Sequence, residues 1–92
     1  MKKANNAYKS DKLIRVSLQY DESDNTIHSI AITGDFFLHP EEVLERLEAN
    51  LVGTKLEKEL VMSVISTSLN GSKVFGFDPQ SMTEAILGCL NK

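Results

Sequence analysis

The sequence predicts an α+β fold, in which a small antiparallel sheet based on a β-hairpin is covered on one face by about three helices. Apolar side chains alternate along residues 13–20 and 26–33, which is the period of a half-buried strand. From residue 40 onward they recur at spacings of three and four, which is the period of a helix. Because the strands precede the helices instead of alternating with them, we expect the helices on one face of the sheet. The 92 residues are predicted to form one domain.

Residues 1–11 show no hydrophobic periodicity, and we expect a flexible N-terminal leader there. The first fifteen residues carry five basic side chains against Asp11, a charge of +4, whereas the remainder carries five basic and twelve acidic residues, a charge of −7. A basic arm of this kind can bind nucleic acid. The basic residues are scattered, however, and the acidic remainder would repel a phosphate backbone, so we expect no nucleic-acid partner.

The hydropathy of the chain predicts no membrane partner. No apolar run approaches the roughly 18 residues that a membrane-spanning helix needs. Lys2 and Lys3 are not followed by the apolar region of a signal peptide. We therefore expect a cytoplasmic protein.

The hairpin is predicted from two short runs with a polar turn between them. The turn "DESDN" is rich in residues that hydrogen-bond their own backbone, and Ile30 and Ile32 then share one face of the second strand. A lone hairpin is marginally stable in water, so the rest of the chain must cover its apolar face. On the first strand that face consists of Ile14, Val16, Leu18 and Tyr20.

Three helices are predicted to supply this cover. The first spans residues 40–52 with Pro40 at its start, and the second spans residues 55–69. Asp78 is expected to cap the third helix, with Pro79 in its first turn. The apolar stripes of the three helices are Val43, Leu44, Leu47 and Leu51; Leu56, Leu60, Val61, Val64, Ile65 and Leu69; and Met82, Ala85, Ile86, Cys89 and Leu90.

No catalytic, cofactor-binding or metal site is predicted. Cys89 is the one cysteine, so an internal disulfide and a multi-cysteine metal site are excluded, and its place on an apolar stripe favours a buried thiol. His28 and His39 show no metal-ligand spacing with it. Gly34 follows a strand, as a phosphate-binding turn does, but a single glycine followed by Asp35 makes no anion cradle. The solvated face of the first helix is expected to carry Glu41, Glu42, Glu45 and Glu48.

The adjacent Phe36 and Phe37 are the most informative candidates for a binding surface. In an extended stretch, neighbouring side chains point to opposite sides, so one ring should pack inside and the other should face outward. The alternative is that the chain bends at Gly34 and buries both rings. Exposed aromatic side chains are favoured as interface anchors. We therefore take Gly34, Asp35, Phe36 and Phe37 as candidate partner-interface residues, without assigning which phenylalanine is buried.

These residues resemble a known family. A hairpin that ends in "GDFF" at residues 34–37, a helix that closes with "LVG" at residues 51–53, and "VFGFDPQSMTEAIL" at residues 74–87 are similar to the C-terminal accessory domain of lipoate-protein ligases. The resemblance covers residues 12–92, and "GDFF" is its most specific part. It implies the same α+β fold as the periodicity does.

The resemblance also implies a function. Lipoate-protein ligases use ATP and Mg to convert lipoate to lipoyl-AMP, and then transfer the lipoyl group to a lysine of a carrier protein. Nothing in this sequence resembles the catalytic domain's glycine-rich arginine motif or its reactive lysine loop. The chain therefore looks like the separately encoded accessory subunit, which forms a heterodimer with a large catalytic subunit and meets lipoyl carrier domains only indirectly. Alone it would bind none of these ligands.

Two other classes of function remain open on the residues alone. One is a stand-alone protein-interaction or dimerisation module, unrelated to lipoate, on the same α+β scaffold. The other is a small independent enzyme, for which catalytic spacing is lacking. Self-association without a ligase partner would favour the first of these.

Overall fold

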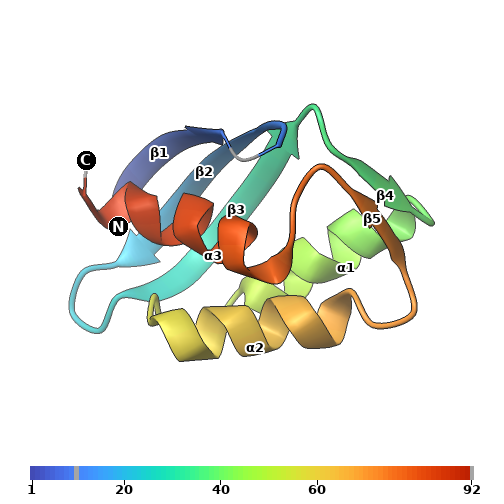
Figure 1. Ribbon diagram of the computed structural model, residues 1–92. Coiled ribbons are helices and arrows are strands. Elements are labelled where there is room, and N and C mark those ends of the chain that lie inside the picture. The colour runs from blue at the N-terminus through green and yellow to red at the C-terminus, as the bar shows by residue number, and fades with distance from the viewer. Residues whose placement is uncertain (10, 92) are drawn as a thin grey trace.

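The computed structural model describes residues 1–9 and 11–91, and it confirms the α+β fold. Three helices lie on one face of an antiparallel three-stranded sheet, and a separate two-stranded ribbon lies at one end of the molecule (Figure 1). The larger sheet has the strand order β1-β2-β3, and the ribbon pairs β4 with β5. In chain order the elements are β1 (Lys2–Lys9), β2 (Leu13–Asp21), β3 (Thr26–Gly34), β4 (Phe37–His39), α1 (Glu42–Leu51), α2 (Lys58–Ser68), β5 (Lys73–Phe75), α3 (Pro79–Leu87) and the 3-10 helix η1 (Gly88–Asn91).

The N-terminal segment is an edge strand, where the sequence predicted a flexible leader over residues 1–11. All eight residues of β1 pair with β2, from Lys2 opposite Tyr20 to Lys9 opposite Leu13. The amide of Asn6 also donates to the carbonyl of Ala85 in α3, at 2.9 Å. Backbone pairing and this side-chain bond order a segment whose few apolar residues gave no period-two signal. Residue 10 lies outside the described residues.

The β2–β3 hairpin supplies the buried apolar residues of the large sheet. The four residues predicted for the apolar face of the first strand are all buried. On β3 the outcome is mixed, because Ile32 is buried while Ile30 is only half-buried. The register shifts between Gln19 and Tyr20, which places Ile27 opposite Tyr20 and buries it as well. A bulge of this kind moves a residue to the other face, so simple alternation missed Ile27.

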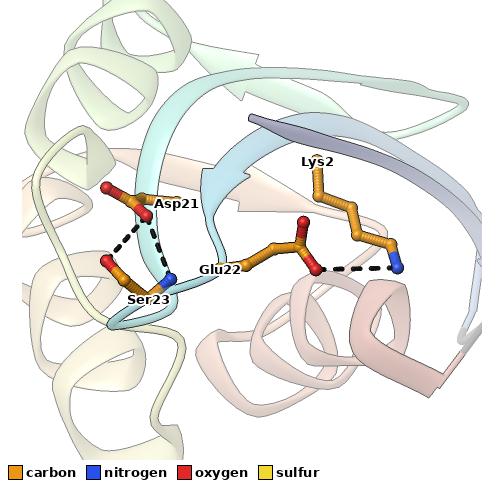
Figure 2. Close-up of polar contacts among 4 residues, drawn as sticks. All are labelled: Lys2, Asp21, Glu22 and Ser23. Carbon is orange, nitrogen blue, oxygen red and sulfur yellow. Dashed lines mark hydrogen bonds and ion pairs between the residues drawn. The ribbon is translucent and has the colours of Figure 1, made fainter.

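The turn between β2 and β3 is closed by a side-chain bond at its start (Figure 2). The carboxylate of Asp21 accepts from the backbone N–H of Ser23 at 3.0 Å and from its hydroxyl at 2.8 Å. Both bonds lower the pKa of Asp21 below its ordinary value, and the bond from the backbone N–H has the larger effect. Because the pKa of Asp21 is lower in the folded state than in the unfolded state, its ionised carboxylate stabilises the fold at pH values above the unfolded-state pKa. This contribution is lost as the pH falls through the folded-state pKa. The nearby ion pair of Lys2 and Glu22, at 3.8 Å, is exposed and contributes little.

The free edge of β3 is covered by α1 and by the segment that follows it. The backbone N–H of Ile32 donates to the Glu48 carboxylate at 2.7 Å, and that of Ile27 donates to Thr54 O at 2.9 Å. The prediction that Glu48 belongs to a fully solvated face of the helix is therefore wrong. The other three acids of that predicted face, Glu41, Glu42 and Glu45, are exposed.

We expect Glu48→Ala to lower the free energy of unfolding by about 1–2 kcal/mol, because a buried N–H of the sheet edge loses a charged acceptor. The control is Glu45→Ala, an exposed acid of the same helix, for which a change within about 0.5 kcal/mol is expected. Urea unfolding of both variants measures the difference. Equal midpoints for the two variants would show that the bond contributes no stability.

The second helix begins later than predicted, and this changes which residues face the core. Lys55 bridges to Thr26, and the N–H of Leu56 donates to Asn25 O at 2.9 Å, so this segment is extended. Leu56 is buried before the helix starts. Leu60, in the first turn of the helix, is 44% exposed, so its prediction as part of the apolar stripe that faces the core is wrong. The buried residues within α2 are Val61, Ile65 and Ser68.

The third helix starts as predicted. The Asp78 carboxylate accepts from the N–H of Ser81 at 2.7 Å, and the Ser81 hydroxyl accepts from the N–H of Asp78 at 2.9 Å, a complete capping box. Cys89 lies just beyond this helix, in η1, and is buried as expected. Among the described residues, no helix combines the length and the apolar character needed to cross a membrane.

Candidate functional site

The β4–β5 ribbon joins two segments that are far apart in the sequence. Leu38 pairs with Val74, flanked by the pairs Phe37–Phe75 and His39–Lys73. Because side chains alternate along each strand, the middle pair points inward, where Leu38 is buried and Val74 half-buried. The two flanking pairs point outward and are exposed. The ribbon lies beside the first turn of α1 (Figure 1).

Gly34 and Asp35 turn the chain from the large sheet into the ribbon. Gly34 has a φ of +154°, and a Cβ at this position would lie 2.1 Å from Leu13 O. The backbone N–H of Asp35 donates to the same carbonyl at 3.0 Å, while its carboxylate is exposed. The bend is therefore tied by the backbone of Asp35. Because this amide is already bonded to Leu13 O, the turn does not fit a phosphate group.

Phe36 is the inward-facing member of the phenylalanine pair. Its ring is partly buried and packs edge-to-face on Phe77, with 5.0 Å between ring centroids and 83° between ring planes. Phe77 is itself only 8% exposed. Such a pair is worth about 0.5–1.5 kcal/mol beyond the area that it buries. The prediction that one ring packs inside and the other faces outward is confirmed.

Phe37 faces outward, and the structure adds a partner that the sequence did not predict. Phe37 is 57% exposed and lies against Phe75, which is 60% exposed, with ring centroids 6.2 Å apart. Phe75 and Phe77 are two apart in sequence, a spacing that would put both on one face of a regular strand. Gly76, with a φ of +100°, turns the backbone between them, so Phe77 enters the core and Phe75 does not.

The other residues considered for chemistry are dispersed. His28 is exposed on β3 and His39 is exposed on the ribbon. The Cys89 sulfur lies 3.9 Å from Ala85 O in the core. The part of the chain that the structure describes holds no group of three side chains able to ligate a metal ion. Nor does a buried side-chain nitrogen or oxygen in that part lack a hydrogen-bond partner.

A hollow lies on the face of the sheet opposite the helices. Its volume is about 410 Å³, and it is lined mostly by small side chains of β1, β2 and β3 such as Ala7, Ser17 and Ala31, together with Arg15. Most of the residues that line it are exposed. The exposed aromatic pair on the ribbon is therefore the more distinctive surface.

We expect Phe36→Ala to lower the free energy of unfolding by about 2–3 kcal/mol, because it removes a partly buried ring and its contact with Phe77. Phe37→Ala is the matched control and should change it by no more than about 0.5 kcal/mol, since its ring is largely in solvent. Thermal unfolding of the isolated chain compares the two. A larger loss for Phe37→Ala would reverse the assignment of inward and outward rings.

Comparisons with known proteins identify the fold. Residues 13–90 match the family model described as "Bacterial lipoate protein ligase C-terminus". The chain is 37% identical over 75 residues to "Lipoate-protein ligase A subunit 2" of Thermoplasma acidophilum, which covers 80% of this chain and 76% of that protein. It also superposes, with a TM-score of 0.81 and 34% identity, on a chain from the structure of a bi-partite lipoate protein ligase and its E2 lipoyl domain from the same organism, covering 92% of this chain and 94% of that one. The chain belongs to the family of lipoate protein ligase C-terminal domains.

Proposed function

We propose that this chain is the non-catalytic accessory subunit of a two-part lipoate-protein ligase. It docks on a large catalytic subunit in the cytoplasm and enables the ATP-dependent activation of lipoate to lipoyl-AMP, which precedes transfer to a carrier-protein lysine. The observation that carries the proposal is the match, across more than nine-tenths of both chains, to a chain in the structure of a bi-partite ligase.

The substrates ATP and lipoate, and the Mg ion, are assigned to the catalytic subunit. A triphosphate needs free backbone N–H groups or cations, and the Gly34–Asp35 turn has its amide bonded to Leu13 O. At the start of α1 lie Glu41 and Glu42, whose charge disfavours an anion there. Neither the Gly34–Asp35 turn nor the start of α1 therefore fits the triphosphate.

The contribution of this chain is preorganisation of its partner. Fixing the backbone of one loop residue costs about 1–2 kcal/mol, so a catalytic loop that must close over two substrates is costly to order. A rigid domain that packs against such a loop takes part of this cost out of the activation step. The Phe36–Phe77 contact and the Asp35–Leu13 bond attach the ribbon to the core, which supports that role.

Reconstitution tests the proposal. The chain is mixed with the catalytic subunit, ATP, Mg and lipoate, and pyrophosphate release and co-elution on a sizing column are measured. We expect the two proteins to co-elute and pyrophosphate release to require both. Full pyrophosphate release by the catalytic subunit alone would contradict the proposal.

The second candidate is a stand-alone protein-interaction or dimerisation module unrelated to lipoate, for which the exposed Phe37–Phe75 pair would be a contact surface. Analytical ultracentrifugation of the isolated chain distinguishes the two. A monomer that becomes a heterodimer with the ligase subunit supports the accessory role, whereas a stable homodimer that ignores this subunit supports the module.

A further inference from the structure

The outward face of the ribbon combines aromatic and cationic side chains. Phe37 lies opposite Phe75, and the next outward pair is His39 opposite Lys73. All four are exposed, and none of the four is an acid. Lys2–Glu22 is the one ion pair found within residues 1–9 and 11–91, so the Lys73 ammonium has no carboxylate partner within the described part of the chain.

The exposed area of the two phenylalanines is too small to hold a second copy of the chain by itself. If a phenylalanine presents roughly 200 Å² when free, exposures of 57% and 60% leave about 230 Å² on the two residues. A stable interface buries about 800 Å² on each partner, so the rings supply only a quarter to a third of one side. A flat contact between two ribbons would hide part of each ring, whereas a concave apolar pocket can enclose both.

The charge of the face points the same way. In a symmetric dimer each ribbon would meet its own counterpart, and none of the four outward residues is a carboxylate that could pair with Lys73 of the other copy. A different protein can supply an acid at the rim of its pocket. Such a charge pair would fix the orientation of docking and raise the association rate.

We propose that the outward face of the β4–β5 ribbon, formed by Phe37, His39, Lys73 and Phe75, is the surface that docks on the large catalytic subunit, in an apolar pocket with an acidic rim. The inference rests on the proposed function and assigns a surface to it. The two rings fill the pocket and Lys73 pairs with the rim. Gly34, Phe36 and Phe77 hold the inner side of the ribbon on the core. The docking surface is therefore already formed before the partner binds.

Binding of the full chain to the catalytic subunit, measured by calorimetry, tests the surface. Phe37→Ala and Phe75→Ala should each raise the Kd by at least about tenfold, and the double variant by about a hundredfold or more. The concentration of chain needed for half-maximal pyrophosphate release should rise by the same factors. Leu60→Ala is the matched control, since Leu60 is 44% exposed in the first turn of α2, whose start lies at the other end of the molecule (Figure 1). Its Kd should stay within about twofold of the wild-type value.

A charge variant keeps the test independent of folding. Lys73→Glu leaves the core untouched and should weaken binding by at least about fivefold, more than Lys73→Gln does. Added salt should weaken binding of the wild-type chain more than that of Lys73→Gln, because screening acts on the charge pair.

The possible results distinguish a failure of the proposed docking surface from a failure of the proposed function. One outcome is that the wild-type chain binds and activates the catalytic subunit, but the aromatic and lysine variants have the same Kd as the wild type. This outcome would contradict the proposed docking surface and leave the proposed function supported. Failure of the wild-type chain to bind the catalytic subunit would overturn both.

Discussion

Replacing Gly34 with alanine is expected to lower the free energy of unfolding by at least about 3 kcal/mol, and the melting temperature by about 12–24 °C. The new Cβ would lie 2.1 Å from Leu13 O, a backbone atom, and 3.1 Å from the Phe36 ring. Relief requires the chain to move away from Leu13, which breaks the Asp35 hydrogen bond and shifts Phe36 from Phe77. The φ of +154° adds strain for any residue with a side chain.

Gly53→Ala controls for backbone strain alone. Gly53 has a φ of +88°, but a Cβ there would meet nothing within 4 Å, so about 1–2 kcal/mol is expected. Calorimetric melts of the two variants measure the difference. Similar losses at both positions would show that the contact with Leu13 is not the reason for glycine at position 34.

A second large effect is expected at Ile65, which is fully buried in α2. Ile65→Ala should lower the free energy of unfolding by about 2–4 kcal/mol, through lost burial and the cavity that remains. Leu60→Ala, in the same helix, should change it by no more than about 0.5 kcal/mol. Urea unfolding compares them. Equal losses of stability would show that Leu60 faces the core, as the sequence predicted.

Hydrophobic periodicity and capping chemistry predicted the parts of the fold that depend on local sequence. The alternation from Ile14 to Tyr20 and the cap at Asp78 are both present as expected. Each of these signals acts within a few residues of its effect. The fold class followed from them, because a hairpin and helices with one apolar face have few ways to pack.

The features that the sequence did not predict depend on pairing between distant segments. The strand β1 is ordered by its hydrogen bonds to β2 and by the Asn6–Ala85 bond, and Ala4 and Tyr8 add partly buried contacts with the core. In the sequence, Glu48 resembles the other acids of its helix. Only the fold places it at the edge of β3. Local patterns contain no information about such pairings.

The candidate site was predicted in part for the same reason. Alternation required Phe36 and Phe37 to point to opposite sides, but Phe77 decides which of them is inside. The pairing of three-residue strands across the chain brings Phe75 to Phe37, and strands this short leave almost no period in the sequence. The sequence therefore predicted one half of the aromatic pair.

The most direct test of the accessory role separates the two half-reactions of the ligase. With the catalytic subunit at fixed concentration, omission of this chain should slow pyrophosphate release from ATP and lipoate by about a hundredfold or more, the scale on which lost positioning acts. Transfer from preformed lipoyl-AMP to a lipoyl carrier domain should change by no more than about threefold, because the activation step has then been bypassed. Equal dependence of both half-reactions on this chain, or activation at full rate without it, would contradict the account.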